Sequence, residues 1–87
     1  MKTFLLKISS PEGDLFSEEV ISIRLRGSEG ELAVLAGHIP FVSSVKPCSF
    51  KIELSDGEEK EGRTGGGMLS VSKDKTVFLT GNVEWKN

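Results

Sequence analysis

The sequence contains few of the residues on which catalysis or covalent cross-linking usually depends. It has one cysteine, one histidine, one tryptophan and no tyrosine among 87 residues. A single cysteine cannot form an internal disulfide, and the place of Cys48 inside an apolar run indicates a small buried side chain, which fits a reducing compartment. Because His38 has no histidine or cysteine near it in sequence, we expect no metal site there.

The sequence also lacks a charge excess and a long apolar run. Eleven basic and thirteen acidic residues leave a net charge of −2, so nothing attracts the chain to nucleic acid or to anionic lipid. The apolar run from Phe4 to Leu6 ends at Lys7 and no small-residue cleavage site follows, which excludes a signal peptide. No segment approaches the roughly 20 apolar residues of a transmembrane helix. We therefore expect no nucleic-acid partner and no insertion into a membrane.

Glycine is abundant, but no cofactor or catalytic motif accompanies it. The run from Gly62 to Met68 lacks the Lys-Ser/Thr pair of a phosphate-binding P-loop, and the run from Gly27 to Gly30 carries Glu29 where a phosphate would require a basic residue. The acidic segment from Asp56 to Glu61 lacks the spacing of a calcium loop, and no nucleophile-elbow sequence presents a serine to His38. We expect no catalytic residue, no cofactor and no metal, so binding is the predicted class of function.

Apolar and polar side chains alternate with a period of two, and turn signals recur about every 8 to 12 residues, as in antiparallel sandwiches and barrels. No segment shows a helical period. The sequence predicts one domain over residues 1–87 with an all-β fold, a flattened antiparallel β-sandwich of about nine or ten short strands. The expected strands are Thr3–Ser9, a short piece at Asp14–Ser17, Glu19–Arg26, Glu31–Leu35, Phe41–Val45, Cys48–Ser55, Met68–Val71 and Thr76–Thr80.

The alternation makes two predictions about which side chains face the core. Within Glu19–Arg26, the alternation places Ile21, Ile23 and Leu25 on the apolar face and Val20 on the opposite one. Near the end of the chain, we expect Val77 and Leu79 to point inward.

The turns give further expectations. Asp56-Gly57 between alternating segments predicts a hairpin with a type I′ turn. The returning segment, Glu58 to Thr64, is almost wholly polar, which is typical of an edge strand protected by charge. Gly81-Asn82 is expected to end the regular structure.

The segment from Gly27 to Pro47 folds back on itself at several corners. Ser28, Glu29 and Gly30 form a tight turn, and the two acids Glu29 and Glu31 lie at its exposed tip. Such a tip can contact a basic loop of a partner protein. Alternatively, the two acids are only solubilising charges, and the residues alone do not separate these hypotheses.

This segment, GSEGELAVLAGHIPFVSSVKP, resembles the signature region of the ε subunit of bacterial and chloroplast F-type ATP synthases. The similarity extends to LKISSPEGDLFSEEVISI before it and to GGGMLSV and KTVFLTG after it, and so covers nearly the whole chain. The residues that agree in order and spacing are Gly27, Glu29, Gly30, Glu31, Leu32, Gly37, His38, Pro40, Lys46 and Pro47.

The resemblance implies the N-terminal β-sandwich of a non-catalytic rotor subunit in the central stalk. Such a subunit links the γ subunit to the membrane c-ring and helps to couple proton-driven rotation to ATP synthesis. It is peripheral, at the cytoplasmic face of the inner membrane, and monomeric when isolated. The implied c-ring-facing residues are Ser28, Glu29, Gly30, Glu31 and Leu32, and the implied γ-facing residues are Ser10, His38, Pro40 and Val42.

Some features depart from the family pattern. Most members continue into a helical hairpin that inhibits hydrolysis, whereas this sequence stops at Asn87. Either the natural chain is this short, in which case we expect the sandwich domain without that hairpin, or the sequence is a piece of a longer chain. Cys48 stands where glycine is usual, and the strand from Glu58 to Arg63 lacks the customary apolar residue. The alternative to a rotor subunit is a free-standing β-sandwich that binds a small ligand, which requires a deep pocket lined by aromatic side chains.

Overall fold

The computed structural model describes residues 2–37 and 39–86, and the regular structure in these ranges is entirely β-strand. This confirms the all-β fold class and the expected number of strands. None of the described residues belongs to a helix with the length and apolar character required to cross a membrane. The strands are β1 (Phe4–Ser10), β2 (Gly13–Gly27), β3 (Gly30–Leu35), β4 (Phe41–Val45), β5 (Cys48–Leu54), β6 (Glu59–Thr64), β7 (Gly67–Val71), β8 (Lys75–Thr80) and β9 (Val83–Lys86).

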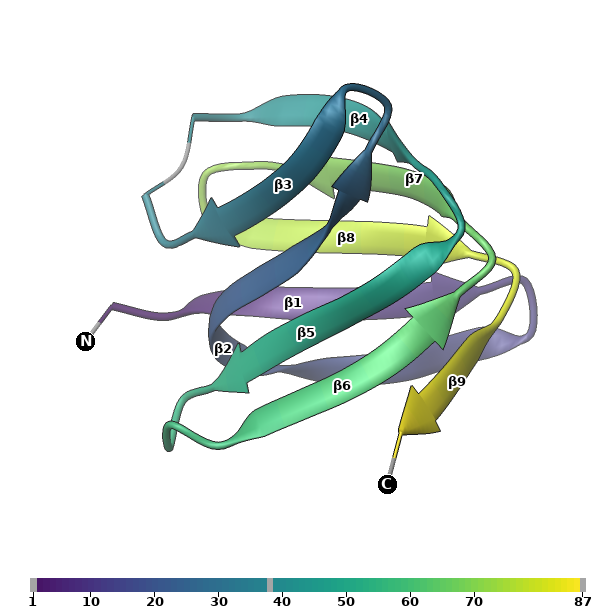
Figure 1. Ribbon diagram of the computed structural model, residues 1–87. Helices are drawn as coiled ribbons and strands as arrows, with labels where there is room; N and C mark the ends of the chain where they lie inside the picture. Colours follow the sequence, from purple (N-terminus) through teal and green to yellow (C-terminus); the bar gives the residue numbers. More distant parts are fainter. Residues whose placement is uncertain (1, 38, 87) are drawn as a thin grey trace.

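The strands form two layers around one core, and β2 passes from one layer to the other (Figure 1). The first part of β2 pairs with β1, and its second part pairs with β3 and β5. One layer therefore contains β1, β8, β7 and β4, and the other contains β3, the end of β2, β5, β6 and β9. The pairings are antiparallel except that of β1 with β8, which is parallel and so differs from the wholly antiparallel expectation. These two strands are far apart in sequence, so no hairpin dictates their direction.

A bulge in β2 changes which residues enter the core. The sequence predicts two separate strands here, but the chain from Gly13 to Gly27 is one strand of 15 residues. Val20 lies opposite Leu54 and Ser22 lies opposite Glu53, so Ile21 is an additional residue on β2. Such an insertion reverses the alternation locally. Val20 and Ile23 are consequently both buried in the core cluster, and the prediction that Val20 faces away was wrong.

The side of β8 that faces the core is also opposite to the one predicted. Phe78 is buried and lies between Ile8 of β1 and Leu69 of β7, whereas Leu79 is 53% exposed. The inward side of β8 also carries Thr80, whose hydroxyl donates to the carbonyl oxygen of Gly66 at 2.8 Å. Since a strand alternates strictly, placing the phenylalanine in the core turns Leu79 to the surface and leaves Val77 half-buried.

The end of the chain adds a ninth strand that the sequence reading missed. Residues Val83–Lys86 pair with Glu61–Thr64, so β6 is flanked by β5 and β9 and is not an edge, and regular structure continues beyond Gly81-Asn82. The register places Gly62 opposite Trp85.

Gly62 leaves room for an aromatic cluster. The rings of Phe50 and Trp85 lie edge to face with centroids 5.6 Å apart, and Phe16 is 5.8 Å from Trp85. The ammonium group of Lys60 covers the Trp85 ring at 4.4 Å. This arrangement explains the absent apolar residue at Gly62 of β6, since the Phe50 ring and the Glu84 carbonyl oxygen lie in the space that a side chain there would occupy.

The hairpin at Asp56-Gly57 exists but is not of type I′. Gly57 has a φ of 91°, whereas no described non-glycine residue has a positive φ, so Asp56 does not meet the requirement of that turn. The amide of Gly57 donates to the Leu54 carbonyl at 2.9 Å, and the Leu54 amide donates to the Glu58 carbonyl at 2.8 Å. These bonds define a three-residue loop with glycine at its last position.

Candidate partner-binding surfaces

The β2–β3 hairpin projects the expected acidic tip. Gly27 pairs with Gly30, and Ser28 and Glu29 form the connection between them. Gly30 has a φ of 127°, a conformation that side chains resist, which explains glycine at this corner. Glu29 and Glu31 are exposed, as expected for an exposed tip, and Leu32 is half-buried against the core.

The two carboxylates of the tip have no ion-pair partner among the residues described. The ion pairs among the described residues lie elsewhere and join Lys7 to Asp14 and Lys86 to Glu61, each at 3.5 Å. Arg26 lies directly across from Glu31 in the β2–β3 register, but the two do not approach within ion-pair distance. The tip therefore presents negative charge that a basic side chain can complement.

A groove of about 420 Å³ separates the tip from β4. We call it the β3–β4 groove, and its lining includes Glu29, Glu31, Leu32, Phe41 and Val42. It follows from the topology, because β3 pairs with β2 while β4 pairs with β7 and touches β2 only where Val45 meets Gly27. Gly27 lies at the junction, where a Cβ would be 3.2 Å from Ser43 Oγ and 3.7 Å from Leu32 Cδ2.

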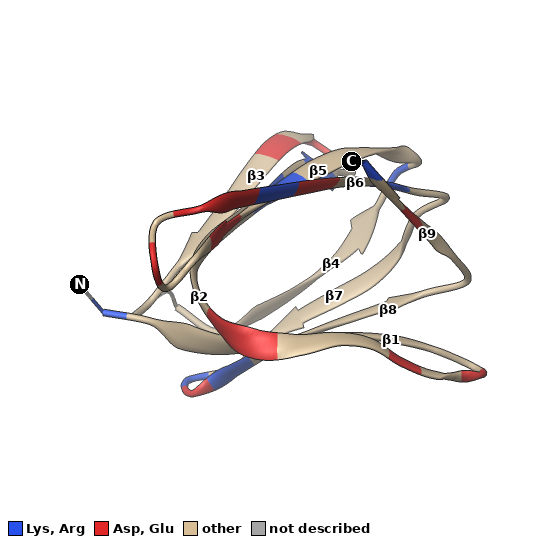
Figure 2. Cartoon of the chain, turned by 90° about the horizontal axis from the view of Figure 1, so that it is seen from below, with Lys and Arg blue, Asp and Glu red and all other residues tan. Residues whose placement is uncertain are grey.

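The outer side of β4, β7 and β8 is almost free of charge. Figure 2 shows β4, β7 and β8 with scarcely any acidic or basic residue apart from the turn that joins β7 to β8, while β5 and β6 carry many. Val42 is 66% exposed, and Met68 and Leu79 lie side by side in the β7–β8 register and are also exposed. We call this surface the uncharged face, and its outward residues are Val42, Ser44, Met68, Ser70, Val77 and Leu79, with Lys75 as a charged residue at its margin, where β8 begins.

Met68 and Leu79 are the residues of this face that the sequence reading did not identify. Leu79 was expected in the core, and nothing singled out Met68 for a surface role. A signal was present in the composition of β7, where Met68 and Ser70 alternate with Leu69 and Val71 without a charged residue. A strand that alternates without charge can place apolar side chains on both faces.

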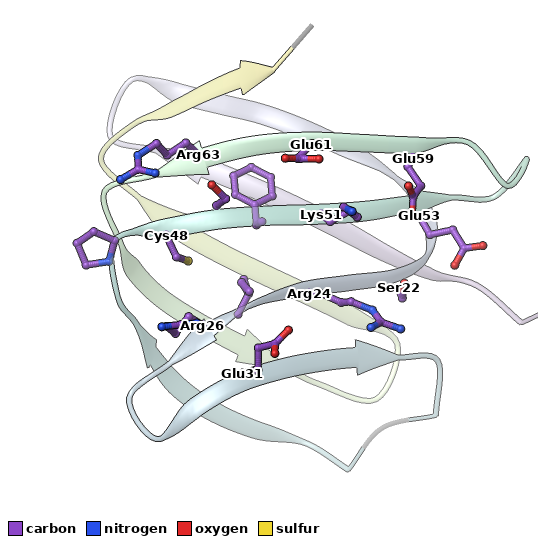
Figure 3. A pocket seen from close by; sticks show the side chains of 14 residues that line it. Ser22, Arg24, Arg26, Glu31, Cys48, Lys51, Glu53, Glu59, Glu61 and Arg63 are labelled. Atoms are coloured by element: carbon purple, nitrogen blue, oxygen red, sulfur yellow. The ribbon is translucent and has the colours of Figure 1, made fainter.

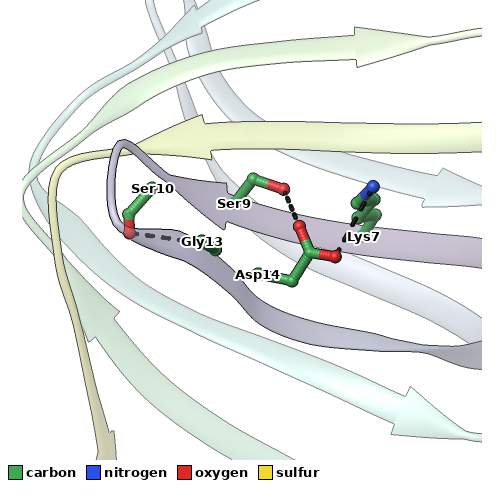
Figure 4. Close-up of polar contacts among 5 residues, drawn as sticks. All are labelled: Lys7, Ser9, Ser10, Gly13 and Asp14. Carbon is green, nitrogen blue, oxygen red and sulfur yellow. Dashed lines mark hydrogen bonds and ion pairs between the residues drawn. The ribbon is translucent and has the colours of Figure 1, made fainter.

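Ser10 and Pro40, two of the remaining γ-facing candidates, lie at the margins of the uncharged face. Ser10 ends β1, next to Ser9, which is paired with Leu79. The Ser10 hydroxyl donates to the carbonyl oxygen of Gly13 at 3.3 Å and shapes the hairpin (Figure 4). Pro40 is exposed immediately before β4, and His38 lies outside the described residues.

Neighbouring bonds hold that hairpin in place. Ser9 Oγ donates to Asp14 Oδ1 at 2.9 Å, and Lys7 pairs with the other carboxylate oxygen of Asp14 (Figure 4). Ser10 thus belongs to a hairpin turn that hydrogen bonds and an ion pair stabilise.

The opposite layer bears a wide, shallow groove of about 810 Å³ lined largely by charged side chains (Figure 3). Lys51 lies opposite Glu61, which pairs with Lys86, and such opposite charges stabilise a sheet surface without requiring a ligand. Like charges also lie opposite one another in this groove, Glu53 across from Glu59 and Arg24 across from Lys51. The groove is not the deep aromatic pocket that a ligand-binding module requires, and the described residues contain no cluster of three metal-ligating side chains.

Comparison with known proteins identifies the family. The model of the ATP synthase delta/epsilon chain β-sandwich domain matches residues 3–86. The chain belongs to this ATP synthase delta/epsilon family. The family match agrees with the two-layer fold and with the resemblance in the segment from Gly27 to Pro47.

Among curated relatives, the sodium-ion-specific ATP synthase epsilon chain of Acetobacterium woodii is 38% identical over 84 residues, which are 97% of this chain and 63% of that protein. The ATP synthase epsilon chain of Clostridium novyi is 37% identical over 84 residues, with coverage of 97% and 64%. The chain thus spans less than two thirds of the length of these epsilon chains.

Solved structures agree with the fold. A chain in the OSCP/F1/c-ring assembly of the Euglena gracilis mitochondrial ATP synthase matches with a TM-score of 0.89 and 25% identity, covering 95% of this chain and 53% of that one. A chain in the central stalk and c-ring of the Tetrahymena thermophila enzyme matches with a TM-score of 0.76 and 14% identity over 94% of this chain and 66% of that one, a likeness of fold.

Proposed function

We propose that this delta/epsilon sandwich is a non-catalytic rotor component that joins the γ subunit to the c-ring of an F-type ATP synthase. In that position it helps to couple proton-driven rotation to ATP synthesis, at the cytoplasmic face of the membrane. The observation that carries the proposal is the presence of two different binding surfaces, the uncharged face and the acidic tip, on one closely packed core. Family membership supports the assignment to the ATP synthase.

The uncharged face is assigned to γ. Met68 and Leu79 present adjoining apolar side chains, with Val42 and Pro40 at one margin and Ser10 at the other. Burying exposed apolar area stabilises an interface by about 25 cal/mol per Å² before the entropic cost of association. A surface without charge also avoids the desolvation cost that charged groups would impose.

The acidic tip is assigned to the c-ring. Ser28, Glu29, Gly30 and Glu31 are exposed at the end of a hairpin, away from the centre of the uncharged face. Carboxylates without an internal partner favour basic loops and increase the rate of association. Stiffness supports the mechanical role, since close-packed interiors transmit strain. No step of chemistry is assigned to the chain itself.

The assignment to γ is tested by changing Leu79 to serine and measuring binding to purified γ subunit by calorimetry. Leu35 provides a matched control, because it is 52% exposed against 53% for Leu79 and lies on β3, which belongs to the other layer. We expect Leu79→Ser to weaken binding roughly tenfold, as loss of a buried leucine contact predicts, and Leu35→Ser to leave it unchanged. Equal binding by both variants would contradict the assignment.

The assignment to the ring is tested with Glu31→Lys and detergent-solubilised c-ring. We expect weaker binding at low salt with unchanged folding, since an exposed tip contributes little to the core. Glu12→Lys, which makes the same charge reversal at another exposed turn, is the control. Ring binding that is indifferent to Glu31→Lys would show that the two acids are only solubilising charges.

A further inference from the structure

Met68 brings a sulfur atom to the uncharged face. Because β7 alternates, Leu69 and Val71 are buried, while Met68 points outward and is 45% exposed. In the sheet register it lies between Ser44 of β4 and Leu79 of β8. The side chain of Met68 is therefore near the centre of the face and accessible to small reagents in solvent.

The thioether of Met68 gives this face a reactive group that its other outward residues lack. Their side chains are aliphatic or carry the hydroxyl group of serine, which mild oxidants leave unchanged. Hydrogen peroxide transfers one oxygen atom to a thioether: the O–O bond breaks, an S–O bond forms, the sulfur is oxidised by two electrons and water leaves. The product, methionine sulfoxide, is polar and replaces a flexible apolar side chain.

We infer that Met68 is a sulfoxidation site at which a peroxide lowers the affinity of the uncharged face for γ. The inference rests on the proposed function, which assigns this face to γ. Burying a polar group without a hydrogen-bond partner is costly, so a sulfoxide beside Leu79 opposes the burial that the interface requires. Bound γ covers Met68, and the free chain is therefore the form that reacts.

The other two sulfur atoms of the chain belong to Met1 and Cys48, and the experiment separates them from Met68. Cys48 is half-buried on β5, in the opposite layer, so its oxidation does not alter the uncharged face. A Cys48→Ser chain removes this thiol. Trypsin releases residues 64–73 as one peptide, in which Met68 is the only sulfur-containing residue.

The Cys48→Ser chain is treated with hydrogen peroxide, freed of the reagent, and titrated with purified γ by calorimetry. We expect one added oxygen in the peptide of residues 64–73 and roughly tenfold weaker binding, as loss of a buried apolar side chain predicts. Methionine sulfoxide reductases for both epimers, with dithiothreitol as reductant, should restore the binding. They convert the sulfoxide to thioether and water while the dithiol becomes a disulfide.

Two controls identify Met68 as the residue responsible. Met68→Leu in the same Cys48→Ser chain is compared with its own untreated form, and we expect peroxide to leave its affinity for γ unchanged. Addition of γ before the peroxide should slow oxidation of Met68 several-fold. Urea unfolding followed by Trp85 fluorescence checks that the treated chains remain folded.

The outcomes separate the inference from the proposed function. If oxidation at Met68 leaves γ binding unchanged while Leu79→Ser weakens it, the proposed function stands and the inference fails. An equal loss of binding by the treated Met68→Leu chain, or an oxidation rate that γ does not change, would also overturn the inference. If the untreated chain does not bind γ, the proposed function and the inference both fail.

Discussion

Replacing Gly62 with alanine places a methyl group against the ring of Phe50. The added Cβ would lie 2.7 Å from Phe50 Cζ and 3.1 Å from the carbonyl oxygen of Glu84. Carbon atoms pack at about 3.5 to 4.0 Å, so either the ring or β9 must move. Gly62 does not have a positive φ, and the effect is therefore one of packing and not of backbone strain.

The expected magnitude follows from two opposing effects. Overpacking a well-packed core costs about 1 to 3 kcal/mol. Replacing glycine by alanine also stabilises by about 0.4 to 1 kcal/mol, because the unfolded chain loses conformational freedom. We expect a net loss of about 1 to 2 kcal/mol in the free energy of unfolding, which lowers the urea midpoint by on the order of 1 M.

The assay is urea unfolding followed by the fluorescence of Trp85, the only tryptophan, with circular dichroism as a second probe. Trp85 is directly opposite Gly62 and contacts Phe50, so its emission also reports the local displacement. Gly81→Ala is the control, since nothing lies within 4 Å of a Cβ there and its φ is not positive. If Gly62→Ala unfolds at the same midpoint as Gly81→Ala with unchanged emission, the proposed packing of Phe50 over Gly62 is refuted.

Two further predictions concern buried contacts. Thr80→Val removes a hydroxyl that bonds to the Gly66 carbonyl and lies 2.8 Å from the Thr64 hydroxyl, so we expect a loss of about 1 to 3 kcal/mol in thermal unfolding, with Thr80→Ser much closer to the original protein. Similar melting of the valine and serine variants would contradict a role for the hydroxyl. Lys60→Gln removes the cation above Trp85, and we expect a loss of about 0.5 kcal/mol together with a changed Trp85 emission spectrum, while an unchanged spectrum would show that the contact is not populated.

The two binding surfaces differ because the two layers differ in charge. β4 and β7 carry no charged residue, whereas β5 and β6 carry both acids and bases. An adaptor between two partners benefits from this division, because a charged surface is costly to desolvate and discriminates against an apolar partner.

Much of the fold could be predicted from the sequence. The alternation of Phe4, Leu6 and Ile8 placed these residues in the core, and the predicted strand from Phe41 to Val45 agrees with β4 at both ends. The glycine-punctuated turn from Ser28 to Gly30 was also predicted to be exposed. These features depend on neighbouring residues, because side-chain alternation and turn geometry are local properties of the backbone.

Other features depended on partners distant in the chain. The inward direction of Phe78 is decided by Ile8 and Leu69, which lie on strands that the local pattern of β8 does not specify. The strand at Val83–Lys86 forms by pairing with β6, and the bulge at Ile21 is visible only in the pairing of β2 with β5. In each case, pairing between strands that are distant in sequence decided the register and therefore which side chains face the core.

The acidic tip itself was determined by the sequence, since Gly30 permits the corner and Glu29 and Glu31 flank it. Its environment was decided only by the tertiary structure. Phe41 and Val42 lie near the tip because β2 pairs with both β3 and β4 near Gly27. The local sequence pattern does not predict that these two pairings share Gly27. Residue type therefore determined the charge of the tip, and strand pairing decided which apolar surface lies beside it.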